Sequence, residues 1–191
     1  MEAASIQPSM QAVPERTLQD LLPKGRTRLA TVCAGATLVA ASFIVFGMSG
    51  RALVGAILCP VLVVLAAIDR SHHLLPNAIV FPAVLALGLA LAATNPAGFL
   101  EHLWAALALG AFLFVFALLA RSGLGMGDVK VSFLLGLALG SRTLSAMMIA
   151  FFGLFLAALW ILARNGVSAR RRAIPFGPFL ALGGIAAFFL T

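Results

Sequence analysis

Two aspartates, Asp69 and Asp128, are the residues of this chain best suited to chemistry. Three of the six carboxylates lie in the first twenty residues, which leaves Asp69, Glu101 and Asp128 for the rest of the chain. Two carboxyl groups that meet cannot both ionise cheaply, so such a pair holds one shared proton over a wide pH range. The charged member can deprotonate a water while the protonated member donates to a scissile carbonyl. This is aspartic-protease chemistry, for which we expect no cofactor and no metal.

Asp69 closes an apolar run, and Pro76-Asn77 follow after six intervening residues. Pro76 suits the first turn of a helix, where its missing N–H costs nothing. A simpler interpretation is that Asp69 only neutralises Arg70 at a helix end. Because the macrodipole disfavours an anion at a helix C-terminus, a cation alone would serve better there. Both interpretations of Asp69 stay open on this segment alone.

Asp128 follows three glycines that alternate over residues 123–127. Such a segment is a poor helix interior, and it allows close approach of a neighbouring helix or of an extended substrate. A helix beginning near Asp128 would stabilise the charged carboxylate. The alternative is a flexible loop with an N-cap aspartate. A phosphate-binding loop is disfavoured, because the acid stands where a phosphate needs a cation or an amide.

The composition places these acids in a membrane protein. The 191 residues are 62% hydrophobic and 10% charged, with a mean hydropathy of +1.10; an ordinary soluble domain has roughly 45–50% and 25%. This excess excludes a soluble globular domain and a disordered chain. The net charge of +7 does not indicate nucleic-acid binding, because the cations are spread between long apolar runs. We therefore predict an all-α, polytopic transmembrane helical bundle.

Hydropathy divides the chain into an N-terminal tail, 1–28, and an integral-membrane domain, 29–191. Seven apolar segments are candidate spans: 29–50, 52–68, 75–93, 99–120, 129–140, 144–163 and 174–190. The first two are joined only by Gly50-Arg51, so whether residues 29–68 cross twice stays open, and we expect six or seven helices. The fifth segment is too short for a hydrocarbon core of about 30 Å. It must tilt, begin inside the preceding loop, or lie in a thin or water-filled region.

The cations orient these spans. With the N-terminus in the cytoplasm and sides alternating at each span, only Arg51 and Arg142 of the thirteen Lys and Arg residues fall outside. Asp69 and Asp128 then share the cytoplasmic side, whereas Glu101 lies on the opposite side. Topology therefore singles out the two aspartates as a pair.

Three motifs in this order resemble a known family. They are Asp69 followed by Pro76-Asn77, then Gly125-x-Gly127-Asp128-x-Lys130, then Pro175-Phe176-Gly177-Pro178. Over about residues 55–185 the chain resembles the type IV prepilin peptidases, within the GxGD intramembrane aspartyl proteases. The resemblance implies that Asp69 and Asp128 are the catalytic pair. We expect Lys130 to be an electrostatic or positioning partner of Asp128, and Pro175 and Gly177 to shape the entry of the last helix. The residues expected to support the pair or lie near the substrate are Pro76, Asn77, Gly125, Gly127, Lys130, Pro175 and Gly177.

The resemblance also implies a substrate and a location. Prepilins carry a basic leader that is cut after a glycine, at the cytoplasmic face of the bacterial inner membrane, just before their hydrophobic segment. The expected partners are thus a prepilin and membrane lipid, with pilus-assembly machinery as a further candidate and no nucleic acid. Larger family members have paired CxxC motifs associated with N-methylation, whereas Cys33 and Cys59 form no such motif. The chain is therefore similar to the short peptidases of tight-adherence (Flp-type) pilus systems, and methyltransferase activity is not expected.

Three alternatives stay open. A GxGD protease could act on another membrane substrate, and an assembly factor of the same fold could be catalytically silent. A small proton- or cation-coupled transporter could use the two aspartates as a relay. Such carriers favour inverted repeats and acids near the bilayer midplane. The chain shows no internal repeat, and both acids lie at a boundary.

Overall fold

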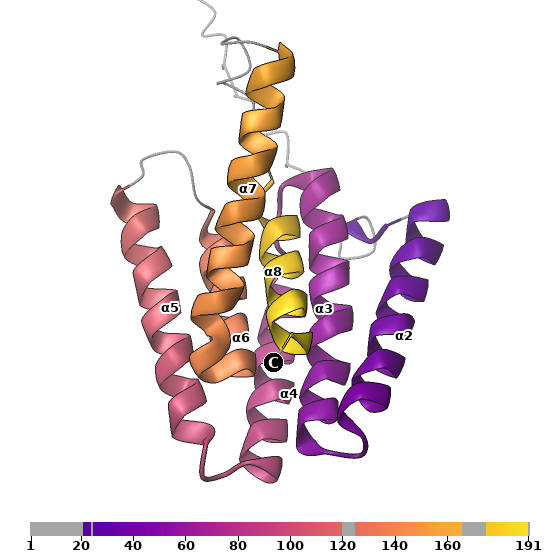
Figure 1. The fold of residues 1–191 in the computed structure, drawn as a ribbon, viewed down its shortest axis with the longest axis vertical. Helices are drawn as coiled ribbons and strands as arrows, with labels where there is room; N and C mark the ends of the chain where they lie inside the picture. Colours follow the sequence, from indigo (N-terminus) through magenta and orange to yellow (C-terminus); the bar gives the residue numbers. More distant parts are fainter. Residues whose placement is uncertain (1–20, 24, 120–124, 166–174, 191) are drawn as a thin grey trace, which may run out of the picture.

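A computed structural model of the chain describes residues 21–23, 25–119, 125–165 and 175–190. Throughout these residues the regular elements are helices, as predicted. Figure 1 shows them as a bundle, with α2 and α5 at opposite edges. The helices are α2 (Arg26–Phe46), α3 (Gly50–His72), α4 (Asn77–Thr94), α5 (Phe99–Leu119), α6 (Met126–Leu139), η1 (Gly140–Arg142), α7 (Thr143–Asn165) and α8 (Gly177–Phe189).

The long apolar helices confirm a multi-pass membrane protein. Within the described residues, five helical stretches are long and apolar enough to span a bilayer when α6 to α7 is counted as one stretch, and α8 is a shorter apolar helix. The first hairpin, left open by the sequence, forms two separate helices, because α2 ends at Phe46 and α3 begins at Gly50. Most of the expected tail, including residues 1–20, lies outside the described residues.

Helix α6 is short, as predicted, and it begins earlier than hydropathy suggests. Its 14 residues rise about 21 Å, less than the roughly 30 Å hydrocarbon core. It begins at Met126 rather than at position 129, which brings Asp128 into its first turn. Gly140 ends the helix with a φ of 57°, and the chain then reverses into α7 (Figure 1).

The buried core lies between α3, α4, α6 and α8. Helix α3 contributes a row of fully buried aliphatic side chains, which meets rows from the other three helices. Large apolar side chains are exposed on α2, α5 and α7, as expected of helix faces that contact lipid. The largest fully buried side chains include Leu58, Leu62, Leu65, Ile68, Leu87, Leu134, Leu135 and Leu180.

The direction of the helices places four termini at one end of the bundle. Helix α3 ends at that end, and α4, α6 and α8 begin there (the upper end in Figure 1). Asp69 lies near the end of α3, and Asp128 lies in the first turn of α6. The fold therefore brings the two aspartates to the same end of the molecule, as the counting of cations predicts.

Candidate active site

Asp69 is a buried carboxylate, 6% exposed, in the last turn of α3. Its Oδ2 accepts a hydrogen bond of 2.9 Å from the backbone N–H of Gly177, the first residue of α8. A Cβ at position 177 would lie 2.7 Å from this oxygen, closer than real side chains approach. Glycine at 177 thus lets the start of α8 reach Asp69.

Asp128 is held in a similar way by its own segment. It is 8% exposed, and its Oδ2 accepts a hydrogen bond of 3.2 Å from the backbone N–H of Gly125. In return, the N–H of Asp128 donates to the carbonyl oxygen of Gly125 at 3.0 Å. This is the reciprocal bonding of a helix N-terminus, with Gly125 as the N-cap. The predicted helix start near Asp128 is confirmed.

The two aspartates line one pocket of about 280 Å³. Gly127 lets the first turn of α6 pack closely against the segment that follows α3, because a Cβ at position 127 would lie 2.8 Å from the Cβ of Leu75. The pocket is lined by Asp69, His73, Leu74, Leu75, Gly125, Met126, Gly127, Asp128 and Lys130.

Lys130 lines the same pocket, but its hydrogen bond goes to a partner that we did not predict. Its Nζ donates to Oδ1 of Asn77 at 2.7 Å, and it lies 5.6 Å from the ring centroid of Phe81. The expectation paired Lys130 with Asp128, whereas the side chain ties the start of α4 to α6. Pro76 is the N-cap of α4, in keeping with its expected place at a helix start.

The last motif shapes the start of α8. Phe176 is the N-cap of this helix, and its ring stacks on Phe151 of α7 with 5.5 Å between centroids. Pro175 precedes it in the chain. Gly177 does more than open the helix, because its N–H reaches Asp69. Gly123 and the cluster Arg170-Arg171-Arg172 lie outside the described residues.

Four residues that line the pocket were not predicted: His73, Leu74, Leu75 and Met126. His73 caps α3 with a φ of 51°, and its backbone N–H donates to the carbonyl oxygen of Asp69 at 2.8 Å. The signal available in the sequence was its place between Asp69 and Pro76. The leucines and Met126 carry no chemical signal, since apolar residues abound in this chain.

The donor set of the site favours acid–base chemistry by carboxylates. Among the residues that the structure describes, no group of three or more His, Cys, Asp or Glu side chains comes together to hold a metal ion. One aspartate can activate a water while the other protonates a carbonyl oxygen.

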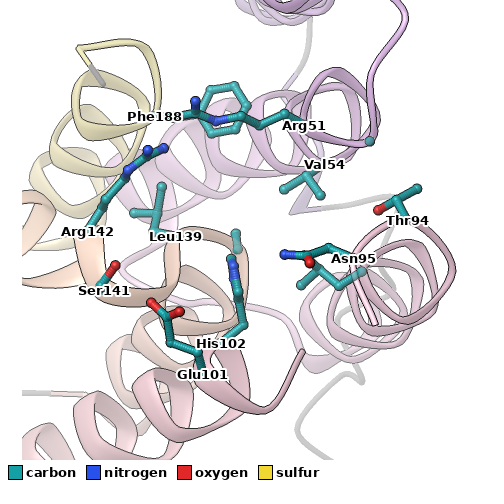
Figure 2. Close-up of a pocket in the computed structure, with 13 residues that line it drawn as sticks. Arg51, Val54, Thr94, Asn95, Glu101, His102, Leu139, Ser141, Arg142 and Phe188 are labelled. Carbon is teal, nitrogen blue, oxygen red and sulfur yellow. The ribbon is translucent and has the colours of Figure 1, made fainter. Parts of the chain in front are cut away.

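A second polar pocket lies at the opposite end of the bundle (Figure 2). It measures about 440 Å³, and its lining includes Glu101, His102 and Arg142. Nδ1 of His102 lies 2.8 Å from the carbonyl oxygen of Leu137. Gly50 at the start of α3 also lines this pocket, and nineteen helical residues, or about 28 Å, separate it from Asp69. Glu101 therefore takes no part in the aspartate pocket.

Comparison with known proteins shows the family of this chain. Residues 56–162 match the model of the type IV leader peptidase family. The chain is 33% identical over 169 residues to a prepilin leader peptidase/N-methyltransferase of Burkholderia pseudomallei, covering 82% of this chain and 52% of that protein. It is 32% identical over 162 residues to the protein of the same name from Bacillus subtilis, covering 84% of this chain and 63% of that protein.

The chain thus spans about half to two thirds of the length of these relatives. No solved structure shows a significant match. The matched region, residues 56–162, contains both aspartates and all the other residues that line their pocket. The chain belongs to the type IV leader peptidase family.

Proposed function

We propose that this chain is a membrane-embedded aspartic endopeptidase that removes the basic leader of type IV prepilins or prepilin-like proteins. One observation carries the proposal. Two buried aspartates, from helices that are far apart in the sequence, line a single pocket, and each accepts a hydrogen bond from a backbone N–H. The names of the relatives in Burkholderia pseudomallei and Bacillus subtilis support the substrate class. Family membership disfavours the transporter alternative.

The geometry suggests how the pair would work. In each aspartate one backbone hydrogen bond engages Oδ2, which leaves Oδ1 and a second lone pair of Oδ2 to bind water or to exchange the shared proton. The ionised carboxylate takes a proton from a water as that water attacks the scissile carbonyl. The protonated carboxyl donates to the carbonyl oxygen, and the pair later supplies a proton to the leaving amine.

Topology supports cleavage at the cytoplasmic membrane face. With the N-terminus inside, eleven of the thirteen cations lie on the side that holds Asp69 and Asp128, since only Arg51 and Arg142 fall outside. The leader would lie in the cytoplasm, and the hydrophobic segment of the prepilin would lie in the inner membrane. The supporting residues of the pocket would then contact the extended cleavage segment.

The test is cleavage of a purified prepilin by the enzyme in proteoliposomes, followed on a gel. Asp69→Asn and Asp128→Asn should each lower the cleavage rate at least about 10²-fold, the usual contribution of an acid–base group. Glu101→Gln is the matched control, because it neutralises a carboxylate at the other end of the bundle and should leave the rate unchanged. Thermal unfolding in detergent checks that each variant folds. Cleavage that survives both aspartate substitutions contradicts the proposal.

A further inference from the structure

An apolar groove begins beside the aspartate pocket, between α4, α5 and α6. Its volume is about 480 Å³, and Lys130 is the one charged side chain among the described residues that line it. The same Lys130 lines the aspartate pocket, so the two cavities adjoin at this side chain. The groove is lined by Val80, Phe81, Val84, Leu107, Gly110, Ala111, Phe114, Val129, Lys130 and Phe133.

The groove leads from the aspartates toward the middle of the bundle. Val129 and Phe133 follow Asp128 along α6, and Val80 and Val84 follow the start of α4 at the same end. On α5 the lining extends from Phe114 to Leu107, seven residues or about 10 Å. This length matches two turns of a docked helix, which would present side chains at i, i+3, i+4 and i+7.

We propose that this groove binds the apolar helix of the substrate, immediately after the scissile bond. The inference rests on the proposed function and assigns it a docking surface. Because Lys130 lines both cavities, a chain that passes this side chain as it leaves the aspartates enters the groove. The substrate backbone would be extended at the aspartates and helical from the groove onward.

Small residues on α5 make room for this occupant. Gly110 is buried and Ala111 is exposed, and both line the groove. A Cβ at position 110 would lie 3.4 Å from the ring of Phe133, which is ordinary contact. The packing of α5 on α6 therefore does not demand glycine here. Small residues at such a position are those that let a further helix approach closely within a membrane.

Charge at the mouth of the groove gives the substrate its direction. Lys130 is fixed by its hydrogen bond to Asn77 at 2.7 Å. A cation at this place repels the basic residues of the leader. The apolar groove is then left to the hydrophobic segment that follows the scissile bond. Lipid acyl chains are the rival occupant, and they carry no such directional signal.

The first test fills the groove. Ala111→Trp should raise the KM for a prepilin on the order of tenfold, the loss expected when one apolar side chain no longer buries, with kcat little changed. Ala40→Trp is the matched control, an exposed alanine on α2 at the other edge of the bundle (Figure 1). A KM unaltered by Ala111→Trp, or raised equally by both variants, overturns the inference.

The second test locates the substrate directly. In a Cys33→Ala background that also carries Asp128→Asn, Ala111→Cys and Ala40→Cys are oxidised with prepilins that carry single cysteines along their apolar segment. Disulfides should form with Ala111→Cys only, at substrate positions spaced by three or four residues. Crosslinks without this spacing, or equal at both sites, indicate lipid in the groove and overturn the inference. If the aspartate variants abolish cleavage while both groove tests fail, the proposed function still stands and only the docking surface is wrong.

Discussion

The backbone N–H of Gly177 donates a 2.9 Å hydrogen bond to Oδ2 of Asp69, across 108 positions of sequence. Gly177 is the first residue of α8, so Asp69 lies against the N-terminal end of that helix. The positive end of the helix dipole favours the ionised carboxylate there. Helix α8 therefore fixes both the position and the electrostatic environment of one catalytic candidate.

Gly177→Ala should impair cleavage without unfolding the protein. The new Cβ would lie 2.7 Å from Oδ2 of Asp69, so the carboxylate or the helix must move. A misplacement of about 1 Å can cost on the order of 10²-fold in rate. We expect kcat to fall by tenfold or more, measured with prepilin in proteoliposomes. Gly88→Ala is the control, since its Cβ would meet only Leu137, at 4.0 Å, and an equal loss in that variant would contradict the explanation.

The hydrogen bond between Lys130 and Asn77 predicts an energetic coupling. Lys130→Met and Asn77→Leu should each lower the free energy of unfolding by about 1 kcal/mol, less than the roughly 1.5–3 kcal/mol of a hydrogen bond to a charged group, because this bond is exposed. Because both substitutions remove the same bond, the double variant should cost less than the sum of the two. Denaturation in detergent measures this. Strictly additive losses would mean that Lys130 acts through another partner, with Asp128 as the first to examine.

The orientation in the membrane can be tested with single cysteines in a Cys33→Ala background. Met126 and Ser141 are exposed residues at opposite ends of α6 and η1. We expect a membrane-impermeant maleimide to label Ser141→Cys in intact spheroplasts and Met126→Cys only after permeabilisation. The reverse pattern would place the aspartates outside the cytoplasm and refute the proposed topology.

The cysteine pattern predicts the chemical state of the product. Cys33 lies on α2 and Cys59 is buried in α3. The two cysteines do not form the paired CxxC motifs that are associated with N-methylation in larger family members. Mature pilin made by this chain alone, with a methyl donor supplied, should carry an unmodified N-terminus. Mass spectrometry decides the matter, because a methyl group adds about 14 Da, the mass of one CH₂. Such an addition would show that the chain methylates its product.

Hydropathy and topology together predicted most of the fold. The seven apolar segments correspond to α2 through α8, and the short fifth segment became α6. Its start was misplaced by three residues because Gly127 and Asp128 weigh against a helix in propensity. The reciprocal hydrogen bonds with Gly125 stabilise that first turn and outweigh the propensity cost.

The partners of the site residues were harder to predict than the aspartates themselves. Asp69 and Asp128 could be chosen as candidates from the sequence, because few acidic residues occur in the membrane region. The contact of Gly177 with Asp69 depends on how α8 packs against α3, which no local pattern encodes. Lys130 was expected to be an electrostatic or positioning partner of Asp128, and it lines the same pocket, but its hydrogen bond goes elsewhere. In a helix, residues two positions apart do not face each other, and Asn77 lies within reach instead.

Main-chain N–H groups hold both aspartates, and this lowers the cost of inserting the site into a bilayer. Each additional polar side chain placed in a transmembrane helix would raise the insertion free energy, by about 2.5–3.5 kcal/mol for a central Asp, Lys or Arg. Peptide N–H groups are present in every helix and add nothing to that cost. A lineage can therefore vary the apolar side chains around Asp69 and Asp128 while it keeps the backbone path, and drift in this family should spare Gly177, where a Cβ would lie 2.7 Å from Oδ2 of Asp69.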